Sequence, residues 1–122
     1  MNPTEISSIF LIFNLFFTIY NGNYILLLTE IPVVTTSLLH HHRLIKNIKQ
    51  TDVIVAHYAY WHHMYFAYYY SDLARYAFIL CPILFIFSHI SAFKNNIYIS
   101  QIFHASMHYM LSFGNFILNM NM

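Results

Sequence analysis

The chain has 122 residues, of which 59% are apolar and 7% charged, and its formal net charge is +1. The apolar content excludes an intrinsically disordered protein, and five scattered lysines and arginines are too few to neutralise a row of nucleic-acid phosphates. A soluble globular domain carries about 25% charged residues. The composition therefore predicts an all-α membrane protein, with a single membrane domain over residues 1–122.

The first forty residues predict a transmembrane hairpin. A helix is expected over about 5–20, where the apolar run from Ile6 to Tyr20 extends about 23 Å, short of a ~30 Å hydrocarbon core unless its flanks are included. Asn-Gly-Asn at 21–23 is a strong turn signal. A second helix is expected over about 24–40, so that the two helices run antiparallel.

A polar segment from His40 to Asp52 follows this hairpin. It holds three of the five lysines and arginines, namely Arg43, Lys46 and Lys49. Short loops rich in these cations face the cytoplasm or the mitochondrial matrix. We expect this segment on that side, together with the N-terminus, which lies two crossings earlier.

Residues 53–93 form a long apolar and aromatic stretch that must be divided. One helix of 41 residues would measure about 60 Å, twice what a bilayer needs. The Asp72–Arg75 pair and Pro82 are the candidate breaks, so a break is expected near 71–82. The favoured interpretation places the tyrosine-rich part, 57–70, along the membrane interface and a span over about 72–91. The alternative is one long tilted helix that projects from the membrane.

The last segment, 97–118, is long enough to span a membrane and carries one polar stripe at helical spacing. It is either a spanning helix with that stripe turned toward protein or an amphipathic helix on the membrane surface. The total prediction is three to four transmembrane helices with short loops. The residues of the stripe are Gln101, His104, His108, Ser112 and Asn115.

Three charged residues in or beside the apolar helices are the candidates for a proton relay. Glu30 lies in the middle of the second apolar run, where an ionised carboxylate costs several kcal/mol unless it has a partner, water or a raised pKa. Pro32 frees a backbone carbonyl close to it. Asp72 and Arg75 are three residues apart and can pair on one helix face, either as a surface ion pair or as part of a buried charge relay.

The nine histidines suggest a metal or haem site only weakly. Consecutive residues on a helix point in different directions, so the tract from His40 to His42 is interpreted as a polar segment beside the membrane. His104 and His108 share a helix face, which permits a common metal, but no carboxylate pattern completes a catalytic site. We therefore expect no metal site. No nucleophile or phosphate-binding motif is present, so the chain is expected to be a non-autonomous subunit of a larger assembly.

The segment from Asn23 to Ile31 resembles the second helix of chain 4L of respiratory complex I, in which an apolar leucine-rich stretch precedes a buried glutamate. The resemblance implies that Glu30, and Asp72 in the next long segment, belong to the buried carboxylates that couple quinone reduction to proton translocation. Arg75 would bias Asp72 toward its charged form. Tyrosines replace the small residues expected around Asp72, and residues 94–122 would be an extension.

This resemblance further implies a divergent, ciliate-like protist version of a mitochondrial subunit. The chain would lie in the mitochondrial inner membrane among other membrane subunits of the complex and lipids such as cardiolipin. It would bind no cofactor by itself, and ubiquinone would bind elsewhere in the complex.

A second resemblance involves His104, followed by Asn115 and Phe116. This spacing is similar to that in the small membrane anchor of succinate dehydrogenase, and it implies His104 as a haem b ligand opposite a histidine such as His57 or His89, close to a quinone site. Asn115 and Phe116 lack the phenol hydroxyl of that family. A third possibility is a lineage-specific accessory subunit with a structural role only.

Overall fold

Local capping signals define the first helix of the computed structural model, which describes residues 1–122. Helix α1, Pro3–Asn21, begins where Asn2 Oδ1 accepts a hydrogen bond from the Glu5 amide at 2.9 Å. It ends at Gly22, whose φ of 72° favours glycine. A short 3-10 turn, η1 (Tyr24–Leu26), then leads into α2, Leu27–His41.

Three longer helices follow, and the protein is all-helical, as the sequence predicts. Helix α3 covers Lys49–Tyr70, α4 covers Asp72–Phe93 and α5 covers Ile97–Asn121. The break between α3 and α4 lies at Ser71, which is extended (φ −158°) and whose Oγ accepts from the Ala74 amide at 3.1 Å. One long tilted helix over 53–93 is therefore wrong, because this cap ends α3 and starts α4.

Pro82, the other candidate break, lies inside α4 without ending it. A proline has no N–H, so the carbonyl four residues earlier, that of Phe78, loses its usual helical donor. Tyr60 on α3 replaces it, because its hydroxyl donates to the Phe78 carbonyl at 2.9 Å. The tyrosine both satisfies the freed carbonyl and fastens α3 to α4.

We expect Tyr60→Phe to lower the free energy of unfolding by about 1 kcal/mol, because a buried carbonyl loses the Tyr60 hydroxyl as a donor. In a Pro82→Ala background the new backbone N–H can serve the Phe78 carbonyl, so the same substitution should cost almost nothing. Unfolding in detergent micelles, followed by circular dichroism, measures both. Equal costs in the two backgrounds would contradict the role assigned to Tyr60.

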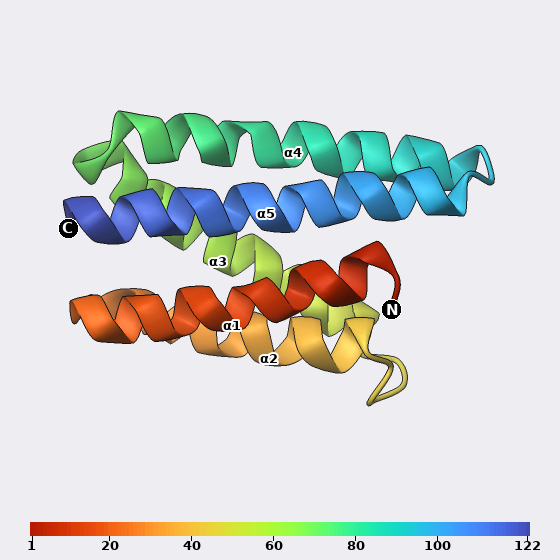
Figure 1. Ribbon diagram of the computed structural model, residues 1–122, viewed down its shortest axis with the longest axis horizontal. Helices are drawn as coiled ribbons and strands as arrows, with labels where there is room; N and C mark the ends of the chain where they lie inside the picture. Colours follow the sequence, from red (N-terminus) through yellow and green to blue (C-terminus); the bar gives the residue numbers. More distant parts are fainter.

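The five helices form two antiparallel pairs linked by a crossing helix (Figure 1). Helices α1 and α2 make one pair and α4 and α5 the other, while α1 and α5 run side by side in the same direction. Helix α3 crosses obliquely behind them. It runs from one end of the bundle to the other, and does not lie at one end as the interfacial interpretation of 57–70 predicts. The N-terminus and the loop after α2 lie at the same end, as the charge pattern predicts.

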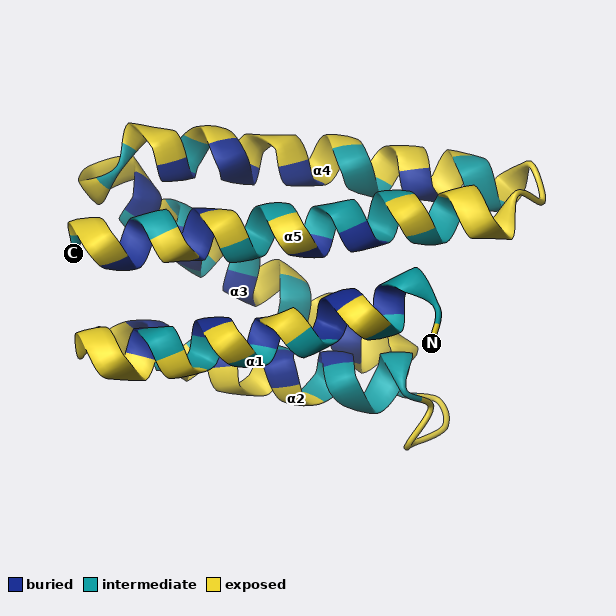
Figure 2. Ribbon diagram, viewed as in Figure 1, coloured by how far each residue is buried: buried dark blue, intermediate teal, exposed yellow.

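The exterior of the bundle is largely apolar and its interior is unusually polar. Figure 2 shows which parts of each helix are buried and which are exposed. Of the buried side chains, 13 are polar or charged and 11 are hydrophobic, so the interior is not an ordinary soluble core. Large apolar side chains are exposed on every helix, for example Phe16, Leu28, Trp61, Ile86 and Phe116. The polar stripe of α5 faces the interior, where His108 and Asn115 are buried.

Two helices, α1 and α4, are long and apolar enough to cross a membrane by length and composition. Helix α2 has 15 residues, which is short for a spanning helix. The expectation of three to four transmembrane helices is thus not established by these features and stays a prediction.

A small apolar core joins the two pairs. It consists of Leu26, Ala67, Ala74, Phe78 and Leu118. Next to it, Gly114 lets α5 approach α4 so closely that a Cβ atom there would lie 2.5 Å from Cε1 of Phe78. Small residues at such contacts are typical of helices that pack in membranes.

Candidate functional site

Glu30 is buried between α1 and α2, as its position in the apolar run predicts. Its exposed fraction is 2%, and its Oε1 accepts a hydrogen bond from Thr18 Oγ1 at 2.8 Å. Its Oε2 is buried and has no hydrogen-bond partner. The only salt bridge of the structure, between Arg75 and Asp72, does not involve it. Glu30 is thus a carboxyl group with one fixed oxygen and one free oxygen.

Two asparagines extend the hydrogen bonds of Glu30 toward the end of the bundle. Asn119 Nδ2 donates to Thr18 Oγ1 at 2.9 Å, and Asn23 Nδ2 donates to Asn119 Oδ1 at 2.9 Å. Asn119 is buried, whereas Asn23 lies half-buried in the turn between α1 and α2. These four residues, Glu30, Thr18, Asn119 and Asn23, form what we call the Glu30 network.

The direction of the hydrogen bonds in the Glu30 network points toward the carboxyl group. Asn119 donates to Thr18, so the Thr18 hydroxyl is left with its own hydrogen to donate to Glu30 Oε1. A proton carried by Glu30 would then sit on Oε2, the oxygen without a partner. Such a group can change its protonation without breaking the contact that holds it in place.

Thr18 and Asn119 are not among the site residues that the sequence predicts. A signal exists for each. Thr18 and Glu30 lie six residues on either side of position 24, so an antiparallel hairpin that turns there brings them opposite each other. Asn119 follows Asn115 by one helical turn and so continues the polar stripe of α5.

Asp72 and Arg75 lie on the surface, away from the Glu30 network. Arg75 Nη2 donates to Asp72 Oδ1 at 2.9 Å, and the Asp72 side chain is 75% exposed. The Arg75 guanidinium also lies over the rings of Tyr68 and Tyr76, at 5.5 and 5.7 Å from their centroids. The structure therefore keeps Glu30 apart from the other two relay candidates within this chain.

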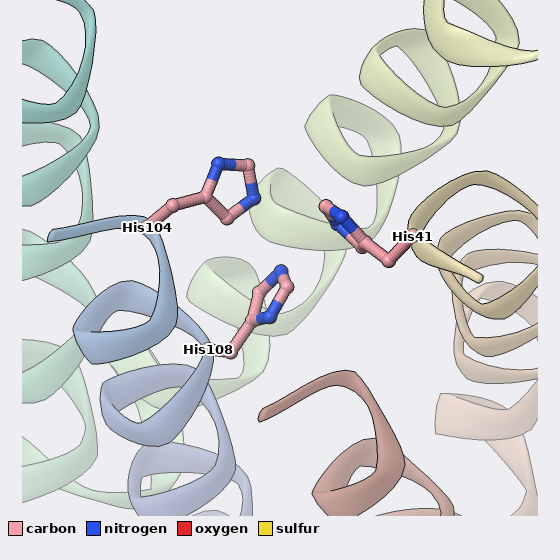
Figure 3. A group of neighbouring side chains, drawn as sticks. All are labelled: His41, His104 and His108. Atoms are coloured by element: carbon pink, nitrogen blue, oxygen red, sulfur yellow. The ribbon is translucent and has the colours of Figure 1, made fainter. Parts of the chain in front are cut away.

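His104 lies with two other histidines near the other end of the bundle (Figure 3). The rings of His104 and His108 on α5 point toward His41 at the end of α2. We call these three residues the histidine cluster; their potential ligand nitrogens lie within 4.8 Å of one another. The His41 and His104 rings meet edge to face at 5.0 Å, so no porphyrin fits between them. A haem held between His104 and His57 or His89 stays a prediction.

Two titratable groups just beyond the expected spans have shifted pKa values. Burial lowers the pKa of His41 to about 3, and the neighbouring imidazoles of His104, His40 and His42 lower it further, so this ring is neutral at physiological pH. Burial raises the pKa of Asp52, whereas a hydrogen bond from Thr36 Oγ1, at 3.1 Å, opposes that shift.

A cavity of about 290 Å³ lies between α3, α4 and α5 and borders the histidine cluster. Asp52, His63, His104, His108 and Asn115 are among its lining residues. His63 is buried and its Nδ1 is hydrogen-bonded to Asn115 Oδ1. The cavity can hold water next to two members of the histidine cluster.

No family model, curated protein or solved structure matches the chain.

Proposed function

We propose that the chain is a multi-pass membrane protein. The apolar exterior and polar interior support this, because lipid solvates apolar side chains while polar side chains must find partners inside the bundle. The length and composition of α1 and α4 agree with it. The proposed spans are about 5–20, 24–40, 72–91 and 97–118. Helix α3 runs obliquely between them, from the end of the bundle where α2 finishes to the opposite end, where α4 begins.

We further propose that it is a subunit of a respiratory complex in the mitochondrial inner membrane, of the kind found as chain 4L of complex I. The observation that carries this proposal is the burial of Glu30 in the second helix with Oε2 free of any partner. The resemblance of the segment around it to that family supports the same assignment. Asp72 lies at the surface of the chain, so a neighbouring subunit covers it in the proposed complex.

In this proposal Glu30 accepts and releases a proton as charges move in neighbouring subunits. The hydroxyl of Thr18 holds Oε1 in both states, and Asn119 holds Thr18. Oε2 takes up the proton. The chain supplies no cofactor chemistry of its own; quinone reduction takes place elsewhere in the complex and is coupled to the charge on Glu30.

We expect Glu30→Gln to reduce quinone-dependent proton pumping severalfold in the assembled complex, because an amide keeps the Thr18 hydrogen bond but carries no exchangeable charge. Assembly, measured on native gels, should be preserved. Pumping is measured as the quinone-dependent change of pH inside vesicles that contain the complex. Glu5→Gln is the matched control, since Glu5 lies in the first turn of α1, where its Oε1 accepts a hydrogen bond from Asn2 Nδ2, and this variant should pump normally.

Normal pumping by an assembled Glu30→Gln complex would exclude a relay role and leave a structural, accessory role for the chain. A bis-histidine absorption spectrum that disappears in His104→Ala would instead support the haem anchor of succinate dehydrogenase. The identity of the copurifying subunits separates the same alternatives, because an iron–sulfur subunit belongs with the haem anchor and an antiporter-like subunit with complex I.

A further inference from the structure

The histidine cluster has the geometry of a metal site. The centroids of the His41, His104 and His108 rings are 4.7, 5.0 and 5.1 Å apart, and each pair of rings meets edge to face. A tetrahedral ion at about 2.05 Å from three imidazole nitrogens places the ring centroids about 5.2 Å apart. Three separate pairs of rings thus agree with one geometry. Small ring rotations would bring the nitrogens from within 4.8 Å to about 3.3 Å.

Ser7 on α1 can hold His108 in the tautomer that suits a metal ligand. The Ser7 hydroxyl contacts both the Thr4 carbonyl, at 3.1 Å, and His108 Nδ1, at 2.8 Å; when its single hydrogen goes to Thr4, its oxygen accepts from His108 Nδ1–H. With the hydrogen on Nδ1, Nε2 of His108 carries a lone pair and faces the other two rings (Figure 3). Metal-binding histidines characteristically donate their second N–H to such a partner.

His41 supplies an independent observation. Its Nε2 is buried and has no hydrogen-bond partner, which is rare for a polar atom in a folded protein. A bound cation would provide the missing partner. His41 is held by α2 and the other two histidines by α5, four residues apart on one face, so an ion would connect two helices that are distant in the sequence.

We propose that His41, His104 and His108 bind one divalent transition-metal ion of the zinc type. Three imidazole ligands and one open position suit Zn²⁺. His104 and His108 also line the cavity that contains Asp52, so a water molecule there can serve as the fourth ligand. The proposed metal site differs from the expectation of no metal that was based on the sequence. The sequence alone does not show that His41 lies beside α5.

This metal site is separate from the Glu30 network. His41 lies eleven positions after Glu30 on the same helix, which corresponds to about 16 Å along the axis. No hydrogen bond joins the two groups. The proposal therefore does not depend on a respiratory function, and it can be tested on the purified chain.

The test is calorimetric titration of the full-length chain in detergent micelles with ZnCl₂. We expect one Zn²⁺ per chain. Ser7→Ala should weaken Zn²⁺ binding roughly 10- to 100-fold, because it removes the partner of a ligand and not a ligand itself. Loss of a ligand should cost more than that in each of three variants, His41→Gln, His104→Gln and His108→Gln. Co²⁺ in place of Zn²⁺ should give the intense visible absorption of a tetrahedral site.

His62→Gln is the matched control, because His62 is hydrogen-bonded to Thr29 outside the cluster. It should bind Zn²⁺ as the wild type does. Far-UV circular dichroism of each variant shows that the helices are retained. Binding that is unchanged by His104→Gln and His108→Gln would mean that the tract at 40–42 alone holds the ion, and this overturns the proposal. Absence of binding by the folded wild type also overturns it.

Discussion

Gly114→Val is expected to lower the free energy of unfolding by about 3 kcal/mol, at the upper end for overpacking a core. A Cβ atom at this position would lie 2.5 Å from Cε1 and 2.9 Å from Cδ1 of Phe78. Phe78 is 1% exposed and belongs to the small apolar core, so other side chains surround its ring. Valine is branched at Cβ and cannot rotate away from the contact.

The measurement is unfolding of the purified chain in detergent micelles, with Phe78→Leu and the double variant alongside. Because leucine withdraws the ring atoms that valine would meet, the double variant should be more stable than the sum of the two single effects predicts. Additive effects would show that Gly114 and Phe78 do not limit the approach of α5 to α4. Gly114→Ala should cost less than valine, since alanine gains up to about 1 kcal/mol of helix propensity over glycine.

Asn119→Leu is expected to cost about 2 kcal/mol, because three hydrogen bonds disappear in the interior. Asn119 Nδ2 donates to Thr18 Oγ1 and to the Asn115 carbonyl, both at 2.9 Å, and Oδ1 accepts from Asn23 at 2.9 Å. Leucine has nearly the same volume, so the cost reports the lost bonds. Thr18 would also lose the donor that directs its hydroxyl to Glu30.

Asn121→Leu provides a control on the same helix. Asn121 is exposed, and its Nδ2 donates to the Ile117 carbonyl at 2.8 Å, the same kind of bond to the preceding turn. Its replacement should change stability by less than about 0.5 kcal/mol. If both variants unfold alike, Asn119 contributes only its own helix contact, and the Glu30 network is not a source of stability.

Much of the secondary structure follows from local signals. The Asn-Gly-Asn turn ends α1 where predicted, because Gly22 can adopt a positive φ. The break inside 53–93 falls at Ser71 and not at Pro82. A serine can cap α4, whereas the effect of Pro82 is compensated by Tyr60, whose hydroxyl comes from another helix. No local rule could foresee that compensation.

The candidate site was predicted in part. The sequence pointed to Glu30 because a carboxylate in an apolar run needs a special environment, and the structure buries it. For Asp72 and Arg75 the sequence left open a surface ion pair or a buried relay, and they form an exposed pair at the start of α4. Charge and hydropathy could not show that Glu30 is buried and Asp72 exposed. Burial depends on which part of each helix is covered by neighbouring helices.

The sequence by itself determined that the chain is helical, where its turns fall and that its composition suits a membrane, because capping, turn chemistry and apolar run length act over a few residues. Only the tertiary structure decided which polar side chains meet. Thr18 with Asn119, and Ser7 with His108, are each 101 residues apart. These pairs meet because α1 and α5 pack side by side. The helical period of a segment shows which of its residues share a face, but it does not show which other helix that face contacts.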